Sequence, residues 1–152
     1  MTVFRLTRTV PLPVRECWRR VTDWRAHAEG VPLTSLASMT EGPVRVGTRF
    51  TVRSAAGPLR MDDPMEVVRW EPPGPDTPGR CRLEKRGRAV VGWAEIEVRP
   101  AGTGSVVVWT EELRIGPLPR LLDPLTARVG RLVFGRALDG LLRRGPAPES
   151  PR

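Results

Sequence analysis

Two amphipathic segments stand near the ends of this chain, and a run of alternating apolar and polar segments lies between them. Near the start, apolar residues follow the i, i+3, i+4, i+7 spacing of a helix that buries one face: Val14, Cys17, Trp18 and Val21. Pro13 suits the first turn of such a helix, where its missing N–H costs nothing. We expect this helix to run to about Trp24 or His27, because Gly30 and Pro32 follow.

The second amphipathic segment predicts a long C-terminal helix. Asp123 is a typical N-cap residue and Pro124 suits the N1 position, so the helix should begin here and continue to about Arg144. Six apolar residues are expected to form the stripe that faces the core: Leu125, Val129, Leu132, Val133, Leu138 and Leu141. Three glycines lie inside the helix, and each costs about 0.5–1 kcal/mol relative to alanine. We expect close approach to a sheet, or space for a ligand, to offset that cost.

Seven segments carry strand patterns, and turn residues separate most of them: 3–10, 36–40, 47–53, 59–70, 80–85, 90–99 and 106–115. We expect the seven strands to follow one another in hairpin order, which indicates an antiparallel sheet. The order of strand, helix, six strands and long helix predicts an α+β domain. In such a domain a curved seven-stranded antiparallel sheet wraps around the C-terminal helix and encloses a cavity.

The 152 residues suffice for one domain, which we place at 1–144, followed by a proline-rich tail at 145–152 that we expect to be disordered. Apolar residues make up 39% and charged residues 28%, which is typical of soluble globular proteins. No apolar run approaches the roughly 20 residues that a membrane span needs. Without a visible secretory signal, a cytoplasmic location is expected. Cys17 and Cys81 then fit buried thiols, because neither lies at metal-ligand spacing.

The net charge of +8 and the pI near 11.3 raise the question of nucleic-acid binding. The basic residues are spread along the chain, and Lys85 is the only lysine. We interpret the cluster at 80–88 as an exposed hairpin and the cluster at 128–144 as the solvated face of the long helix. The chain has no tyrosine and three phenylalanines, which is a poor supply of stacking residues. No specific nucleic-acid partner is therefore expected.

Several motifs resemble those of the START-like, or SRPBCC, superfamily, and in particular its polyketide cyclase/dehydrase-like branch. The helix face described above is followed by Thr22-Asp23-Trp24, and further turn and strand motifs lie at 46–50, 68–73 and 102–109. The resemblance covers nearly the whole chain in element order. It implies a helix-grip fold with a deep cavity between the sheet and the long helix. Members of the superfamily bind lipids, sterols, polyketides or other apolar molecules, and some catalyse cyclisation or dehydration.

Candidate chemistry is sparse. His27 is the only histidine, so any Ser-His-Asp or Cys-His device would need it, and its position favours a surface or helix-capping role. Glu111 shares its strand register with Trp109 and Leu113, so it should face inward unless a bulge brings Glu112 in instead. A buried Glu111 could act as a general acid or base, or anchor a polar group of a ligand; alternatively it pairs with an arginine or lies at the open end of the sheet.

Asp62 and Asp63 precede Pro64 in a turn or bulge context, where a functional pair is conceivable but has no further support in the sequence. Trp109 fits either core packing or stacking on a flat ligand ring. We expect neither a metal site nor a cofactor, since one histidine and scattered carboxylates do not form a ligand set. Six residues are the expected ligand contacts: Phe50, Met61, Trp109, Glu111, Val129 and Val133.

The sequence therefore predicts binding of a small apolar or aromatic molecule, such as a lipid or a polyketide-like compound, in an internal cavity. One alternative is an aromatase/cyclase or dehydratase-like enzyme that acts on a polyketide-type substrate. Another is a protein-interaction module that uses the outer face of the sheet. An inward carboxylate in a roomy cavity would favour the enzyme, whereas an interior filled by side chains would favour the interaction module. The oligomeric state is not indicated.

Overall fold

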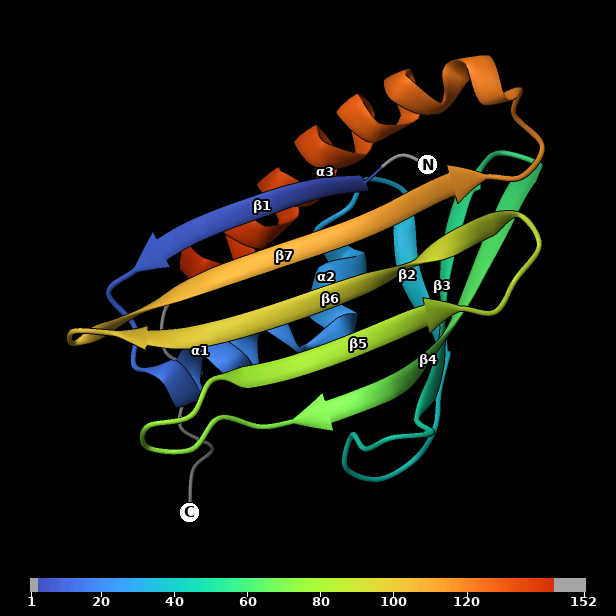
Figure 1. The fold of residues 1–152 in the computed structure, drawn as a ribbon. Helices are drawn as coiled ribbons and strands as arrows, with labels where there is room; N and C mark the ends of the chain where they lie inside the picture. The colour runs from blue at the N-terminus through green and yellow to red at the C-terminus, as the bar shows by residue number, and fades with distance from the viewer. Residues whose placement is uncertain (1–2, 144–152) are drawn as a thin grey trace.

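The structure, a computed structural model, describes residues 3–143 (Figure 1). Its elements are β1 (Val3–Val10), α1 (Val14–Val21), α2 (Trp24–Glu29), β2 (Thr34–Met39), β3 (Arg49–Ala56), β4 (Leu59–Glu71), β5 (Gly79–Lys85), β6 (Val90–Ala101), β7 (Gly104–Ile115), a 3₁₀ turn η1 (Arg120–Leu122) and α3 (Asp123–Arg143). All seven predicted strands are present. The predicted tail, 145–152, lies outside the described residues.

The strands form one antiparallel sheet in the order β1-β7-β6-β5-β4-β3-β2. The first and last strands of the chain are neighbours, because β1 pairs with β7 along its whole length, from Val3 opposite Glu112 to Val10 opposite Ser105. The three helices lie on the same face of the sheet, and α3 runs across it beside β1 and β7 (Figure 1). This arrangement confirms the helix-grip fold.

The first helix is shorter than predicted. It ends at Val21, and a second short helix, α2, begins at Trp24. Asp23 is the cause, because its carboxylate accepts a hydrogen bond from the backbone N–H of Ala26 at 3.0 Å and so caps α2. Thr22 ends α1, where its hydroxyl donates to the carbonyl of Trp18. The break turns α2 toward the cavity described below.

The predicted apolar stripe of α3 is only half right. Leu138 and Leu141 are buried, but Leu125, Val129 and Leu132 are each more than half exposed. In the N-terminal half of the helix, the inward position belongs to Gly130, where an added Cβ would come within 3.2 Å of the Phe4 ring. A small residue there brings the helix close to the sheet and turns the large apolar residues outward. None of the helices within residues 3–143 has the length and apolar character of a membrane span.

Substitution of Leu138 tests which face of α3 is buried. Leu138→Ala is expected to lower the free energy of unfolding by about 2–5 kcal/mol, because it leaves a cavity in the core. The matched control Leu132→Ala should change it by no more than about 0.5 kcal/mol, since this side chain is solvent-exposed. Urea unfolding followed by circular dichroism measures both values. Equal losses for the two variants would contradict this orientation of the helix.

Candidate ligand-binding cavity

A cavity of about 170 Å³ lies on the helix-covered side of the sheet, with walls from α2, strands β2 to β7 and α3. Four aromatic rings dominate its lining: Trp24, Phe50, Trp109 and Phe134. Its volume is below the roughly 300–1,000 Å³ typical of sites for drug-sized ligands. It is close to the roughly 150 Å³ of an apolar cavity that admits benzene. The cavity is therefore sized for a compact ligand of one or two rings.

Four of the six expected ligand contacts line this cavity: Phe50, Met61, Trp109 and Glu111. Val129 and Val133 do not line it. Val129 is exposed on the outer side of α3, for the reason given above, and among the described residues the contribution of α3 to the cavity is Phe134. The helix glycines do not line it either; Gly130 instead permits the contact with Phe4.

Three charged side chains meet inside this apolar lining, and we call them the Asp63–Lys85–Glu111 cluster. The Lys85 Nζ atom lies 2.6 Å from Asp63 Oδ2 and 3.6 Å from Glu111 Oε1. The Lys85 and Glu111 side chains are each only 3% exposed. Asp63 comes from β4, Lys85 from β5 and Glu111 from β7, and each side chain faces the cavity.

The charges of this cluster depend on one another. Burial alone would lower the pKa of Lys85, but its attraction to Glu111 and Asp63 outweighs burial and leaves that pKa raised. Burial raises the pKa of both carboxyls, and Lys85 only partly offsets this effect. Glu111 lies farther from the ammonium and is less exposed than Asp63, but it also accepts a hydrogen bond from Trp109, which lowers its pKa. Both carboxyls therefore bind a proton more readily than a free carboxyl does, beside one ammonium.

Trp109 and His27 extend the cluster along the cavity wall. The indole Nε1 of Trp109 donates to Glu111 Oε2 at 3.0 Å, and its ring centroid lies 4.7 Å from that of His27. His27 Nε2 lies 2.8 Å from the carbonyl of Val21, so this nitrogen carries the proton and Nδ1 is left as an acceptor. Burial lowers the pKa of His27 to about 4. His27 is therefore half-buried and not a surface residue, and its contact with the last carbonyl of α1 fits the helix-capping alternative.

Two buried polar atoms of the cavity-lining residues have no hydrogen-bond partner within the described part of the chain. One is the acceptor Asp63 Oδ1, and the other is the donor Trp24 Nε1. Buried polar groups are nearly always paired, because an unmade hydrogen bond costs about 1–3 kcal/mol. Both atoms are therefore candidates for contact with a ligand.

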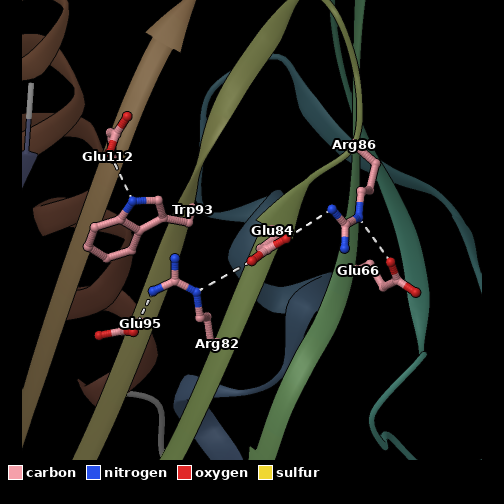
Figure 2. A network of polar contacts seen from close by, with 7 residues as sticks. All are labelled: Glu66, Arg82, Glu84, Arg86, Trp93, Glu95 and Glu112. Carbon is pink, nitrogen blue, oxygen red and sulfur yellow. Dashed lines mark hydrogen bonds and ion pairs between the residues drawn. The ribbon is translucent and has the colours of Figure 1, made fainter. Parts of the chain in front are cut away.

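The facing of Glu111 follows the sheet register without a bulge. Glu111 stands opposite Ala94, and Glu112 stands opposite Trp93. Glu112 points to the outer face, where its carboxylate accepts a hydrogen bond from Trp93 Nε1 at 2.8 Å (Figure 2). Likewise, Asp62 pairs with Arg53 at 2.8 Å, away from the cavity-lining Asp63.

Sequence reasoning missed Lys85 and considered Asp63 only as one half of a functional pair with Asp62. The interpretation of 80–88 as a wholly exposed hairpin is wrong for Lys85, whose side chain is buried. Two signals could have found it. Lys85 alternates with Cys81 and Leu83, which face inward, and it is the one lysine among 25 basic residues. A compact ammonium on a flexible stem fits between two buried carboxylates, whereas a guanidinium fork needs more room.

Other chemistry finds little support among residues 3–143. No group of three or more histidine, cysteine, aspartate or glutamate side chains is arranged to hold a metal ion there. Burial raises the pKa of Cys17 to about 11 and that of Cys81 to about 12, so both thiols stay protonated and unreactive at neutral pH.

The fold and this cavity define a helix-grip protein. The chain belongs to the family described as polyketide cyclase/dehydrase and lipid transport, whose sequence model matches residues 1–145. This membership supports ligand binding in general. No curated protein sequence matches the chain.

Solved structures with this fold include TTHA0849 from Thermus thermophilus, with 19% identity and a TM-score of 0.69 over 91% of this chain and 93% of that one. Ara h 8.0201 has 14% identity and a TM-score of 0.63 over 93% and 98%. Norcoclaurine synthase from Thalictrum flavum, in complex with dopamine and hydroxybenzaldehyde, has 16% identity and a TM-score of 0.58 over 95% and 88%. At these identities the likeness shows the fold.

The neutral His27 should make stability depend on pH. Its pKa is lowered from 6.5 to about 4 by burial, so between these values the unfolded chain binds a proton that the folded protein does not. The free energy of unfolding should therefore fall by about 2 kcal/mol from this residue as the pH drops from 7 to 4.5.

Urea unfolding at both pH values, for the wild type and His27→Gln, tests this expectation. Glutamine keeps a donor for the carbonyl of Val21 but does not titrate. The raised pKa values of Asp63 and Glu111 make the free energy of unfolding rise as the pH drops, which is opposite to the effect of His27. Both proteins contain these carboxyls, so their contribution cancels in the difference between the wild type and His27→Gln. An identical pH dependence in both proteins would refute the assignment of His27 as a buried neutral ring.

Proposed function

We propose that this protein binds a small apolar or aromatic molecule, of a lipid or polyketide-like kind, in the cavity, and that the Asp63–Lys85–Glu111 cluster anchors its polar group. The observation that carries the proposal is the burial of these three charges inside an otherwise apolar, aromatic wall. Buried ion pairs are often no more stabilising than apolar residues of the same volume. Recognition of a ligand therefore accounts for the cluster better than stability does.

The two buried polar atoms without a partner indicate which functional groups the ligand carries. Asp63 Oδ1 needs a donor, such as a hydroxyl or an amine, and Trp24 Nε1 needs an acceptor, such as a carbonyl oxygen. The aromatic rings around them favour a flat apolar body that stacks. A compact aromatic compound with a hydroxyl and a carbonyl group meets all three demands. An open cavity, rather than a filled interior, also supports ligand binding over the interaction module.

An enzyme is the second candidate, and the paired carboxyls favour it. In a dehydration, the Asp63 carboxylate would take a proton from the carbon next to a carbonyl group. The Glu111 carboxylic acid would then protonate the departing β-hydroxyl, so that water leaves and a carbon–carbon double bond forms. The Lys85 ammonium, 2.6 Å from Asp63, would stabilise the enolate oxygen or keep Asp63 ionised.

Ligand binding can be tested with hydroxybenzaldehyde, which carries one ring, one hydroxyl and one carbonyl group. Binding, followed by quenching of tryptophan fluorescence, should weaken about tenfold in Glu111→Gln and in Asp63→Asn, which each remove a carboxyl group of the cluster. Glu112→Gln is the matched control, because it makes the same change one residue away on the outer face. Native mass spectrometry of the protein as purified should also detect a bound small molecule. Equal affinity in all four proteins would rule out the cluster as the anchor.

Catalysis can be tested with a β-hydroxy ketone that bears one phenyl ring. Loss of water gives a conjugated enone, whose ultraviolet absorbance reports the rate. Glu111→Gln and Asp63→Asn should each slow the reaction about 100-fold or more. The rate should fall at low pH as Asp63 gains a proton and at high pH as Glu111 loses its own, which gives a bell-shaped profile. A wild-type rate no greater than that of buffer would reject dehydration of this substrate class and leave the binding proposal standing.

A further inference from the structure

We propose that the outer side of α3 is a docking surface for an anionic lipid bilayer. We call this surface the α3 outer face, and it combines exposed apolar residues with neighbouring arginines: Leu121, Leu125, Val129, Leu132, Arg128, Arg131 and Arg136. It lies on the side of the helix away from the cavity. The proposal does not depend on the ligand in the cavity.

The apolar half of this face is unusually exposed for a folded domain. Leu121 is 89% exposed, Leu125 57% and Leu132 56%. The spacing of Leu125, Val129 and Leu132 is that of one helix stripe, and Leu121 lies in the 3₁₀ turn η1 just before this helix. Contiguous apolar patches on a monomer indicate contact with a protein or a membrane. Gly130 explains why the stripe faces outward, but its position does not explain why these residues are apolar.

The basic half lies in a groove between α3 and the edge strand β1. Four arginines line this groove without a carboxylate at ion-pair distance in the described part of the chain: Arg5, Arg128, Arg131 and Arg136. The one acidic residue of the groove, Asp139, is engaged by Arg8 at 2.7 Å. On the outer face of the sheet, by contrast, arginines are paired with carboxylates (Figure 2). Arg82 contacts Glu84 and Glu95, and Arg86 contacts Glu66 and Glu84.

These two halves together favour a bilayer over the other possible occupants. An apolar stripe flanked by arginines is the pattern of a helix that lies in the headgroup region, where leucines enter the acyl boundary and arginines meet anionic headgroups. A second copy packed face to face would place the unpaired arginines of one copy against those of the other, where their like charges repel. A nucleic acid would use the arginines but leave the leucines in water.

Vesicle co-sedimentation tests the proposal with the full chain. The wild type should bind vesicles of phosphatidylcholine with about 30% phosphatidylglycerol and should not bind pure phosphatidylcholine. The double variant Arg128→Gln/Arg131→Gln should bind roughly thirty-fold more weakly, since each basic residue near an anionic surface contributes about a factor of five. Leu125→Ser/Leu132→Ser should bind at least about tenfold more weakly, because two leucines that enter the acyl boundary become polar.

The control Arg15→Gln/Arg25→Gln removes the same charge from exposed positions on α1 and α2, and it should bind as the wild type does. Circular dichroism should show the same melting temperature for the leucine variant and the wild type, because the substituted residues are exposed. Three results would overturn the proposal. They are no binding to anionic vesicles, binding that the leucine variant retains in full, and a wild-type dimer in sedimentation equilibrium that the leucine variant abolishes. The last would assign the face to a second copy.

Discussion

The strict alternation of side chains across the sheet is the constraint on which this cavity depends. Each of three strands has two consecutive charged residues whose side chains point to opposite faces of the sheet. Asp62 pairs with Arg53 outside while Asp63 faces the cavity, and Glu112 bonds to Trp93 outside while Glu111 is buried. Glu84 and Lys85 part in the same way on β5. A slip of one residue in any of these strands would place the wrong charge inside.

The Asp63–Lys85–Glu111 cluster depends on the mutual compensation of its buried charges. Lys85 stays charged inside the protein because two carboxyls surround it, and the pKa of each carboxyl stays raised because burial outweighs its attraction to this one ammonium. Trp109 adds a hydrogen bond to Glu111 and contacts the neutral His27, which links the cluster to α2. Removal of one member therefore leaves the others uncompensated in an apolar setting, which costs more than the removed contact itself. The polar end of the cavity behaves as one unit.

The sequence predicted the fold well because turn residues and alternation are local signals. It also placed Glu111 inward, since the strand from Val106 to Ile115 has a clean register. It failed where a feature depends on contacts between distant segments. The outward turn of Val129 follows from the approach of Phe4 to Gly130, 126 positions along the chain. The role of Lys85 follows from the meeting of β4, β5 and β7, and the position of His27 depends on its contact with Trp109, 82 positions along the chain.

The contribution of α3 to the cavity wall, limited in the described helix to Phe134, has a consequence for how this protein can change. The walls of the cavity belong mainly to strands, in which alternate residues can be replaced one at a time while their outer neighbours keep the sheet intact. The helix that completes the core contributes a single ring to ligand choice. New ligand preferences can therefore arise through single replacements on β3 to β7, without a compensating change in the helix that holds the domain together.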